Sequence, residues 1–203
     1  IRRFVLRSFA EVYKVGLDLP TLITEDHPLN LDSDAPQYVR DRVEADLTAC
    51  ARMGLADCEI VVLRTAEALG PATGSQLYDF LQAPVCFRPM GFDPMVNVAT
   101  TEDVVAAIEL ATHGSGEGVF NVPGYDTLPL SEAIRLWGTP CVPAPGPVIR
   151  PLYSLRHALT RSDFRYGINR KRMHYGLVLD GNRAREVLGY EAKNPVPWPR
   201  KHG

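Results

Sequence analysis

The sequence of 203 residues lacks several features that would assign a class of protein at once. No two of its cysteines form a Cys-x-x-Cys pair, which excludes the usual zinc-ribbon and thioredoxin-like motifs; they are Cys50, Cys58, Cys86 and Cys141. Reduced cysteines in a cytoplasmic protein are therefore expected. Its five histidines show no metal-ligand spacing, so no metal site is predicted.

The sequence also lacks an excess of charge of one sign. Its 22 Lys and Arg residues nearly balance its 24 Asp and Glu residues, and the net charge is −2. Such a balance argues against nucleic acid as a partner. No apolar run approaches the roughly 18 residues that a membrane span needs. With 45% hydrophobic and 23% charged residues, the composition is that of an ordinary globular chain.

What the sequence does contain is a helical pattern over residues 36–53. Pro36 suits a first helical turn, Ser33 or Asp34 can cap it, and Gly54 offers a stop. Apolar residues recur at helical spacing, at Val39, Val43, Leu47 and Cys50.

Tyr38 and Arg42 are i,i+4 neighbours on this predicted helix. A guanidinium beside the phenol oxygen would favour the ionised form and lower its pKa from about 10, so Tyr38 could act as acid or base. The alternative is that Tyr38 packs its ring on the arginine stem.

Other patterns predict an alternation of strands and helices. Residues 4–6 and 59–64 are apolar runs typical of buried parallel strands, and with the helix between them they predict a β-α-β unit. Helices are expected over residues 74–81 and 130–137, and a further helix is expected to begin after Thr100, which caps it. Strands are expected over residues 84–88 and 119–122.

A proline-rich run over residues 140–147 predicts a linker or rigid extended crossing. It divides the chain into residues 1–139, a Rossmann-like core with interleaved substrate-side elements, and residues 140–203. The second part is locally basic and amphipathic; its cations are Arg150, Arg156, Arg161, Arg165, Arg170, Lys171 and Arg172. It could bind an anionic membrane surface or a phosphate-bearing ligand, or pack its apolar face on the substrate-side region.

Five short motifs stand in an order that resembles the C-terminal portion of the NAD-dependent epimerase/dehydratase family, the extended short-chain dehydrogenases/reductases. Arg3 to Tyr13 resembles the family's central strand and Ser-Ser-x-x-Val-Tyr-Gly turn, and Tyr38 to Arg42 occupies its Tyr-x-x-x-Lys position. The remaining three resemble its later strands and loops: Val62 to Pro71, Gly91 to Ala107, and Gly118 to Gly124.

The resemblance implies site residues, and several of them depart from the family pattern. Tyr38 and Arg42 take the catalytic and cofactor-binding positions, with Arg42 in place of lysine. Phe9 takes the place of the catalytic Ser or Thr, and Glu67 that of an asparagine. Glu11 or Glu67 is expected to touch the substrate. Such losses typically cost about 10²- to 10⁴-fold in rate.

The family's Gly-x-x-Gly-x-x-Gly turn, which binds the cofactor pyrophosphate, has no counterpart in this sequence. We therefore expect NAD or NADP in a complete protein, weak binding by this chain alone, and either a missing N-terminal half or a homodimer.

Together these features predict an α/β fold: the C-terminal part of a doubly wound, Rossmann-like parallel sheet with a small mixed α/β substrate subdomain. The predicted function is an epimerase/dehydratase-like oxidoreductase or isomerase acting on a hydroxyl or carbonyl of a nucleotide sugar or related small molecule. The alternative is a non-catalytic relative that binds a ligand or serves as a subunit.

Overall fold

The computed structural model describes residues 1–160 and 164–199. Its main body is a three-stranded parallel sheet in the order β1-β3-β7, formed by β1 (Arg3–Phe9), β3 (Glu59–Thr65) and β7 (Gly118–Val122). The predicted β-α-β unit is confirmed, because α1 (Gln37–Cys50) connects β1 to β3.

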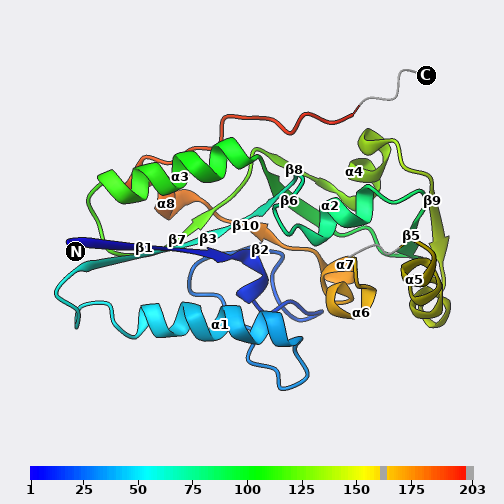
Figure 1. Ribbon diagram of the computed structural model, residues 1–203, viewed down its shortest axis with the longest axis horizontal. Helices are drawn as coiled ribbons and strands as arrows, with labels where there is room; N and C mark the ends of the chain where they lie inside the picture. The colour runs from blue at the N-terminus through cyan, green and yellow to red at the C-terminus, as the bar shows by residue number, and fades with distance from the viewer. Residues whose placement is uncertain (161–163, 200–203) are drawn as a thin grey trace.

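Helices cover both faces of this sheet (Figure 1). Residues along β3 alternate between the faces: Ile60 and Val62 pack with Ala49 of α1. Val61 and Leu63 pack on the other face, against α3 (Thr101–His113) and α8 (Asn182–Leu188). A strand buried on both sides by helices is the mark of a doubly wound sheet, so the predicted fold class is confirmed.

The outer edge of β1 pairs with no strand among the described residues. Ile1 and Phe4 are exposed there, and an apolar hollow of about 650 Å³ lies between β1 and α1.

A second region lies at the opposite end of the molecule from the chain's first residues (Figure 1). Its core gathers aromatic side chains, including Phe80, Tyr153 and Phe164. Its strands are β4 (Glu67–Ala68), β6 (Met95–Ala99) and β8 (Asp126–Pro129) in one sheet, and β5 (Cys86–Pro89) and β9 (Cys141–Ala144) in another. Its helices include α2 (Gln76–Leu81), α4 (Leu130–Trp137), α5 (Gly146–Thr160), α6 (Tyr166–Asn169) and α7 (Arg172–Tyr175).

Of the two predictions for residues 140–147, the extended crossing agrees with the structure and the linker does not. Residues 141–144 form β9, which pairs in parallel with β5. Proline is tolerated there because β9 has a strand partner on one side only, so the missing N–H groups interrupt no second ladder.

For the basic segment, the packing alternative is confirmed over its described part. Ile149 and Tyr153 of α5 are buried, and the Arg156 guanidinium lies 5.0 Å from the ring centroid of Tyr153. Arg161 lies outside the described residues. No helix within residues 1–160 and 164–199 is both long and apolar enough to cross a membrane.

The α1 helix differs from its prediction in two details. Pro36 itself is the N-cap, and neither Ser33 nor Asp34 caps the helix. The buried face contains Asp46 where the apolar pattern predicted Leu47, which is 41% exposed. Asp46 is buried because it has charged and polar partners across the sheet, which apolar periodicity alone could not reveal.

Candidate functional site

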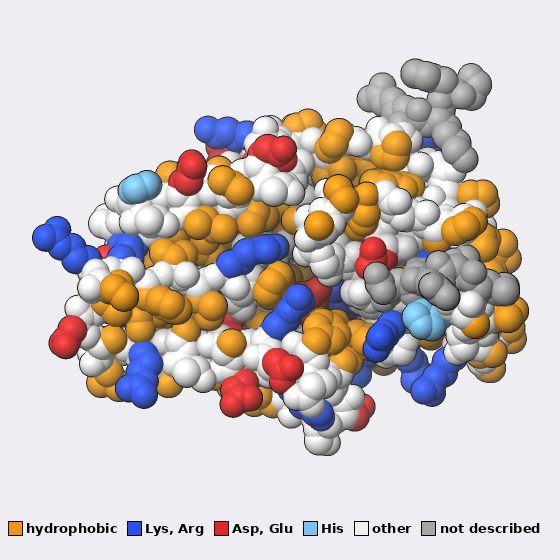
Figure 2. All heavy atoms as spheres, in the orientation of Figure 1, with side chains coloured by type: hydrophobic (Ala, Val, Ile, Leu, Met, Phe, Trp, Pro, Cys, Tyr) orange, Lys and Arg blue, Asp and Glu red, His pale blue; other side chains and the backbone are white. Residues whose placement is uncertain are grey.

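A pocket of about 360 Å³ opens between the end of β1, the start of α1 and the segment from α6 to α7. Glu11, from the 3-10 helix η1 (Ala10–Val12), and Tyr38, from α1, line one part of it. Three consecutive cations line another part: Arg170, Lys171 and Arg172. Lys and Arg side chains gather on the molecular surface over this region (Figure 2). We call it the Tyr38 pocket.

Gly176 ends α7 and lets this helix pack closely against β6, which fixes the position of Arg172. Gly176 has φ +71°, and a Cβ there would lie 2.6 Å from the carbonyl oxygen of Met95. The backbone of Leu177 then donates a hydrogen bond to that same oxygen at 3.1 Å. A residue with a side chain would force α7 away from β6, and with it Arg172.

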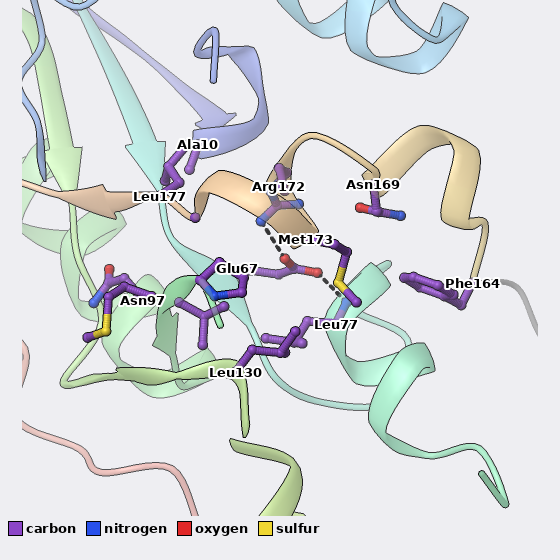
Figure 3. A pocket seen from close by; sticks show the side chains of 14 residues that line it. Ala10, Glu67, Leu77, Asn97, Leu130, Phe164, Asn169, Arg172, Met173 and Leu177 are labelled. Carbon is purple, nitrogen blue, oxygen red and sulfur yellow. Dashed lines mark hydrogen bonds and ion pairs between the residues drawn. The ribbon is translucent and has the colours of Figure 1, made fainter. Parts of the chain in front are cut away.

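Arg172 joins two carboxylates that are far apart in sequence. It lies 2.7 Å from an oxygen of Glu67 and 3.3 Å from an oxygen of Glu11. Arg42 contacts the other Glu11 oxygen at 2.5 Å. Figure 3 shows Glu67 and Arg172 pointing toward each other beside a neighbouring small pocket. These four residues form what we call the Glu11–Glu67 cluster.

The two carboxyl groups differ in their affinity for a proton. Burial raises the pKa of Glu11, whose side chain is 8% exposed. Burial acts in the same direction on Glu67, but Arg172 and the backbone N–H of Leu77 outweigh it and hold the Glu67 pKa below its usual range. Of the two carboxyl groups, Glu11 therefore holds a proton more readily than Glu67.

Tyr38 does not have the lowered pKa that its spacing to Arg42 predicts. Burial, and then the nearby Glu11, raise the pKa of Tyr38 to about 12. The Arg42 guanidinium lies 5.2 Å from the centroid of the Tyr38 ring and pairs with Glu11. The contact with Arg42 is thus one of guanidinium against ring, and the raised pKa keeps the phenol neutral, as a hydrogen-bond donor.

Phe9 lies beside Arg42, whose guanidinium is 3.7 Å from the centroid of the Phe9 ring. Arg7 approaches the same ring at 4.7 Å. The structure thus brings the predicted residues around one centre, with Glu11 shared between the Tyr38 pocket and a smaller cavity that Phe9, Arg42 and Glu67 also line.

Sequence reasoning missed the residue at this centre. Arg172 stood in a basic run with no local signal that set it apart from its neighbours, and its partner Glu11 is 161 positions away. For Arg7, the sequence pattern predicts only a place in the first strand and no role in a site. Among the described residues, no group of three or more His, Cys, Asp and Glu side chains could hold a metal ion.

A second polar network is buried nearby, and we call it the Arg64 network. Arg64 donates to Asp46 at 2.6 Å and to the Tyr13 hydroxyl at 3.1 Å. Ser8 donates to Asp46 at 2.6 Å, and Tyr13 donates to Asn121 at 2.6 Å. This network connects β1, α1, β3 and β7, and it lies beneath the site.

The chain has the fold of NAD-dependent epimerase/dehydratase enzymes, the extended short-chain dehydrogenases/reductases, as the resemblance implied. MoeE5 in complex with UDP-glucuronic acid and NAD matches 98% of this chain and 62% of its own, at TM-score 0.66 and 18% identity. DesIV, a dTDP-glucose 4,6-dehydratase from Streptomyces venezuelae, matches 96% of this chain and 56% of its own, at TM-score 0.65 and 18% identity. WbmG from Bordetella bronchiseptica, in complex with NAD and UDP, matches 96% of this chain and 56% of its own, at TM-score 0.62 and 19% identity.

The chain is also similar in sequence to curated proteins of uncharacterized function. The uncharacterized proteins Mb0513 of Mycobacterium bovis and Rv0501 of Mycobacterium tuberculosis are each 33% identical to this chain over 200 residues, 95% of its length. The chain spans about half of each relative, 51%. No family model matches the chain.

Proposed function

We propose that this chain is the substrate-binding portion of an NAD(P)-dependent enzyme of the epimerase/dehydratase type. It would act on a hydroxyl or carbonyl group of a nucleotide sugar or a related small molecule. One observation supports this most: the Tyr38 phenol, the buried Glu11 carboxyl and three consecutive cations line a single pocket at the end of β1.

The charge of the Tyr38 pocket favours a phosphate-bearing ligand. Arg170 and Lys171 are both exposed. The Lys171 ammonium pairs with Asp32 at 2.8 Å, whereas Arg170 forms no ion pair with a described residue, so the Arg170 charge is the one open to an anion that enters from solvent. Guanidinium groups bind phosphate through paired hydrogen bonds. Of the solved neighbours, MoeE5 holds UDP-glucuronic acid and WbmG holds UDP, and both are phosphate-bearing.

Tyr38 and Glu11 are the proposed proton-transfer groups. A neutral phenol donates a hydrogen bond to a substrate oxygen, and it can give up its proton as negative charge develops on that oxygen. A buried carboxyl with a raised pKa can hold or accept a proton in the same pocket.

The residues present fit a nicotinamide cofactor only in part. Tyr38 remains, but Arg42 is engaged with Glu11 and the Phe9 ring, and Phe9 offers no hydroxyl. We therefore assign Tyr38 and Glu11 to the substrate. NAD or NADP remains the hydride carrier proposed for a complete protein, and we expect no tight binding by this chain alone.

The second candidate is a relative that binds the same ligand without transforming it. The position of Arg42 favours this candidate, since a guanidinium held by Glu11 cannot also activate the tyrosine.

Calorimetric titration with UDP-glucuronic acid tests the proposed function. We expect measurable binding that Arg170→Gln weakens and that Arg150→Gln, an exposed control on α5, leaves unchanged. No binding by the wild-type chain would contradict both candidates.

Turnover separates the two candidates. If the chain converts the sugar nucleotide when NAD is supplied, Tyr38→Phe should lower the rate about 10²- to 10⁴-fold. Binding without turnover favours the non-catalytic relative. A titration with NADH that gave micromolar affinity would contradict the partial fit described above.

A further inference from the structure

A cavity of about 10 Å³ adjoins the Glu11–Glu67 cluster and is separate from the Tyr38 pocket. Arg7 and Arg42 both line it, and their guanidiniums lie 4.7 Å and 3.7 Å from the centroid of the same Phe9 ring. Two cations are therefore held against one apolar ring. Arrangements of this kind are costly unless negative charge balances them.

The charged residues around this cavity do not balance. Three are arginines, Arg7, Arg42 and Arg172, and two are glutamates, Glu11 and Glu67, so the sum is one positive charge. Arg42 and Arg172 pair with the two carboxylates. The surplus charge therefore belongs to Arg7.

Arg7 forms no ion pair within the described part of the chain, and its buried Nε has no hydrogen-bond partner there. Burial and the neighbouring Arg42 lower the pKa of Arg7, which shows that its surroundings oppose the charge. A buried donor without an acceptor is rare in folded proteins and calls for a partner.

Among the described residues, none of the hydroxyl groups that line the cavity accepts a hydrogen bond from Arg7 Nε, and each directs its own hydrogen elsewhere. Ser75 donates to Glu67 at 2.9 Å, Thr73 donates to the carbonyl oxygen of Gly70 at 2.8 Å, and Thr65 donates to that of Ser8 at 3.2 Å. In this arrangement Arg7 Nε is a buried donor for which the described residues supply no acceptor.

We propose that Arg7 is the main ligand of a binding site for the phosphate group of a small molecule, with the neighbouring Arg42, which stays paired with Glu11, adding to the positive field. The cavity has room for about one water-sized atom, which is enough for one phosphate oxygen beside Arg7 Nε. Arg7 and Arg42 are both half-buried residues, and the Arg42 side chain is 26% exposed, so the remaining oxygens can stay on the solvent side of the cavity. Arginine forks match phosphate geometry and supply the charge that the cavity lacks.

This site goes beyond the proposed function. The resemblance gives Arg42 to the cofactor ribose, next to a nicotinamide ring that is cationic when oxidised. The surplus positive charge at this corner favours an anionic ligand over an uncharged one. The inference does not depend on the Tyr38 pocket.

Thermal unfolding and calorimetry with inorganic phosphate test the proposal, with sodium chloride at matched ionic strength as the salt control. Phosphate should raise the Tm of the wild-type chain, and chloride should not. Arg7→Gln should lower phosphate affinity roughly tenfold or more. Its Tm without phosphate should equal or exceed that of the wild type, because an unpaired cation has been removed.

Two controls keep the result decisive. Arg7→Lys keeps the charge but removes the fork and the Nε donor, so it should bind phosphate more weakly than the wild type even if Arg7→Gln fails to fold. Arg150→Gln should respond as the wild type does. Equal phosphate responses from the wild type and Arg7→Lys, or an equal response to chloride, would overturn the proposal. Because UDP-glucuronic acid and Arg170→Gln report on the other pocket, the two proposals can fail separately.

Discussion

The Arg64 network and the Glu11–Glu67 cluster meet near the end of β1, where Ser8 of the network lies on the strand and Glu11 of the cluster lies in η1 directly after it. They differ in how their charges are matched. In the network, Arg64 and Asp46 are paired one to one, with side chains 5% and 0% exposed. In the cluster, Glu11 is shared by two arginines, of which Arg172 is 24% exposed, and Arg7 stands nearby without a partner.

This difference separates a structural role from a functional one. Matched charges with no access to solvent hold a sheet and a helix together, and no ligand can reach them. Incompletely matched charges beside cavities leave binding capacity for a ligand, at a cost in stability. Buried polar residues near an active site are therefore better sorted by their pairing than by their burial.

The largest expected effect comes from breaking the matched pair. Asp46→Asn leaves the Arg64 guanidinium buried without its counter-charge, and we expect the free energy of unfolding to fall by about 3–5 kcal/mol. Urea unfolding measures this. Glu44→Gln, an exposed change on the same helix, should alter stability by less than about 0.5 kcal/mol. A loss below 1 kcal/mol for Asp46→Asn would remove the distinction between the two regions.

A smaller loss is expected from Arg172→Met, because this side chain is partly exposed and Glu11 keeps Arg42. The free energy of unfolding at pH 7 should fall by about 2 kcal/mol. Without Arg172 the Glu67 pKa rises, so the loss should shrink as the pH falls toward 4.5 and protons neutralise the carboxylates. Urea midpoints at pH 7 and pH 5 check this, and a loss that does not depend on pH would contradict it.

The last prediction concerns both regions and is a dependence of stability on alkaline pH, which has no effect at pH 7. Burial raises the pKa of Tyr13, in the network, and of Tyr38, in the pocket, to about 12 from 10. Between pH 10 and 12 the folded state therefore binds more protons than the unfolded state, so this contribution to stability is present below pH 10 and is lost as the pH rises.

Absorbance titration at alkaline pH gives the measurement. Tyr38→Phe should remove one late-ionising phenol from the titration, and so should Tyr13→Phe in the network. If Tyr38→Phe removes an early transition, then Tyr38 is an activated phenol and the first interpretation of its spacing to Arg42 returns.

Local sequence patterns predicted most of the helices and strands. They failed where the structure of a segment depends on pairing with residues far away in the sequence. The helix over residues 130–137 and its stop at Gly138, in the left-handed conformation, follow from short-range signals and are confirmed. The hydrogen bond from the Asp103 backbone N–H to the Thr100 hydroxyl is likewise confirmed. The strand over residues 141–144 was missed because pairing with β5 overrides what proline-rich composition indicates.

For the site, sequence spacing determined that Tyr38 and Arg42 are neighbours, because a helix places residues i and i+4 on one face. Only the tertiary structure decided what that neighbourhood means. Glu11 arrives from the end of β1, 31 residues away, and its carboxylate takes the guanidinium that the phenol would have needed. Periodicity is a property of a short segment, whereas the partner of a buried charge is chosen by the fold, from elements that no local pattern connects.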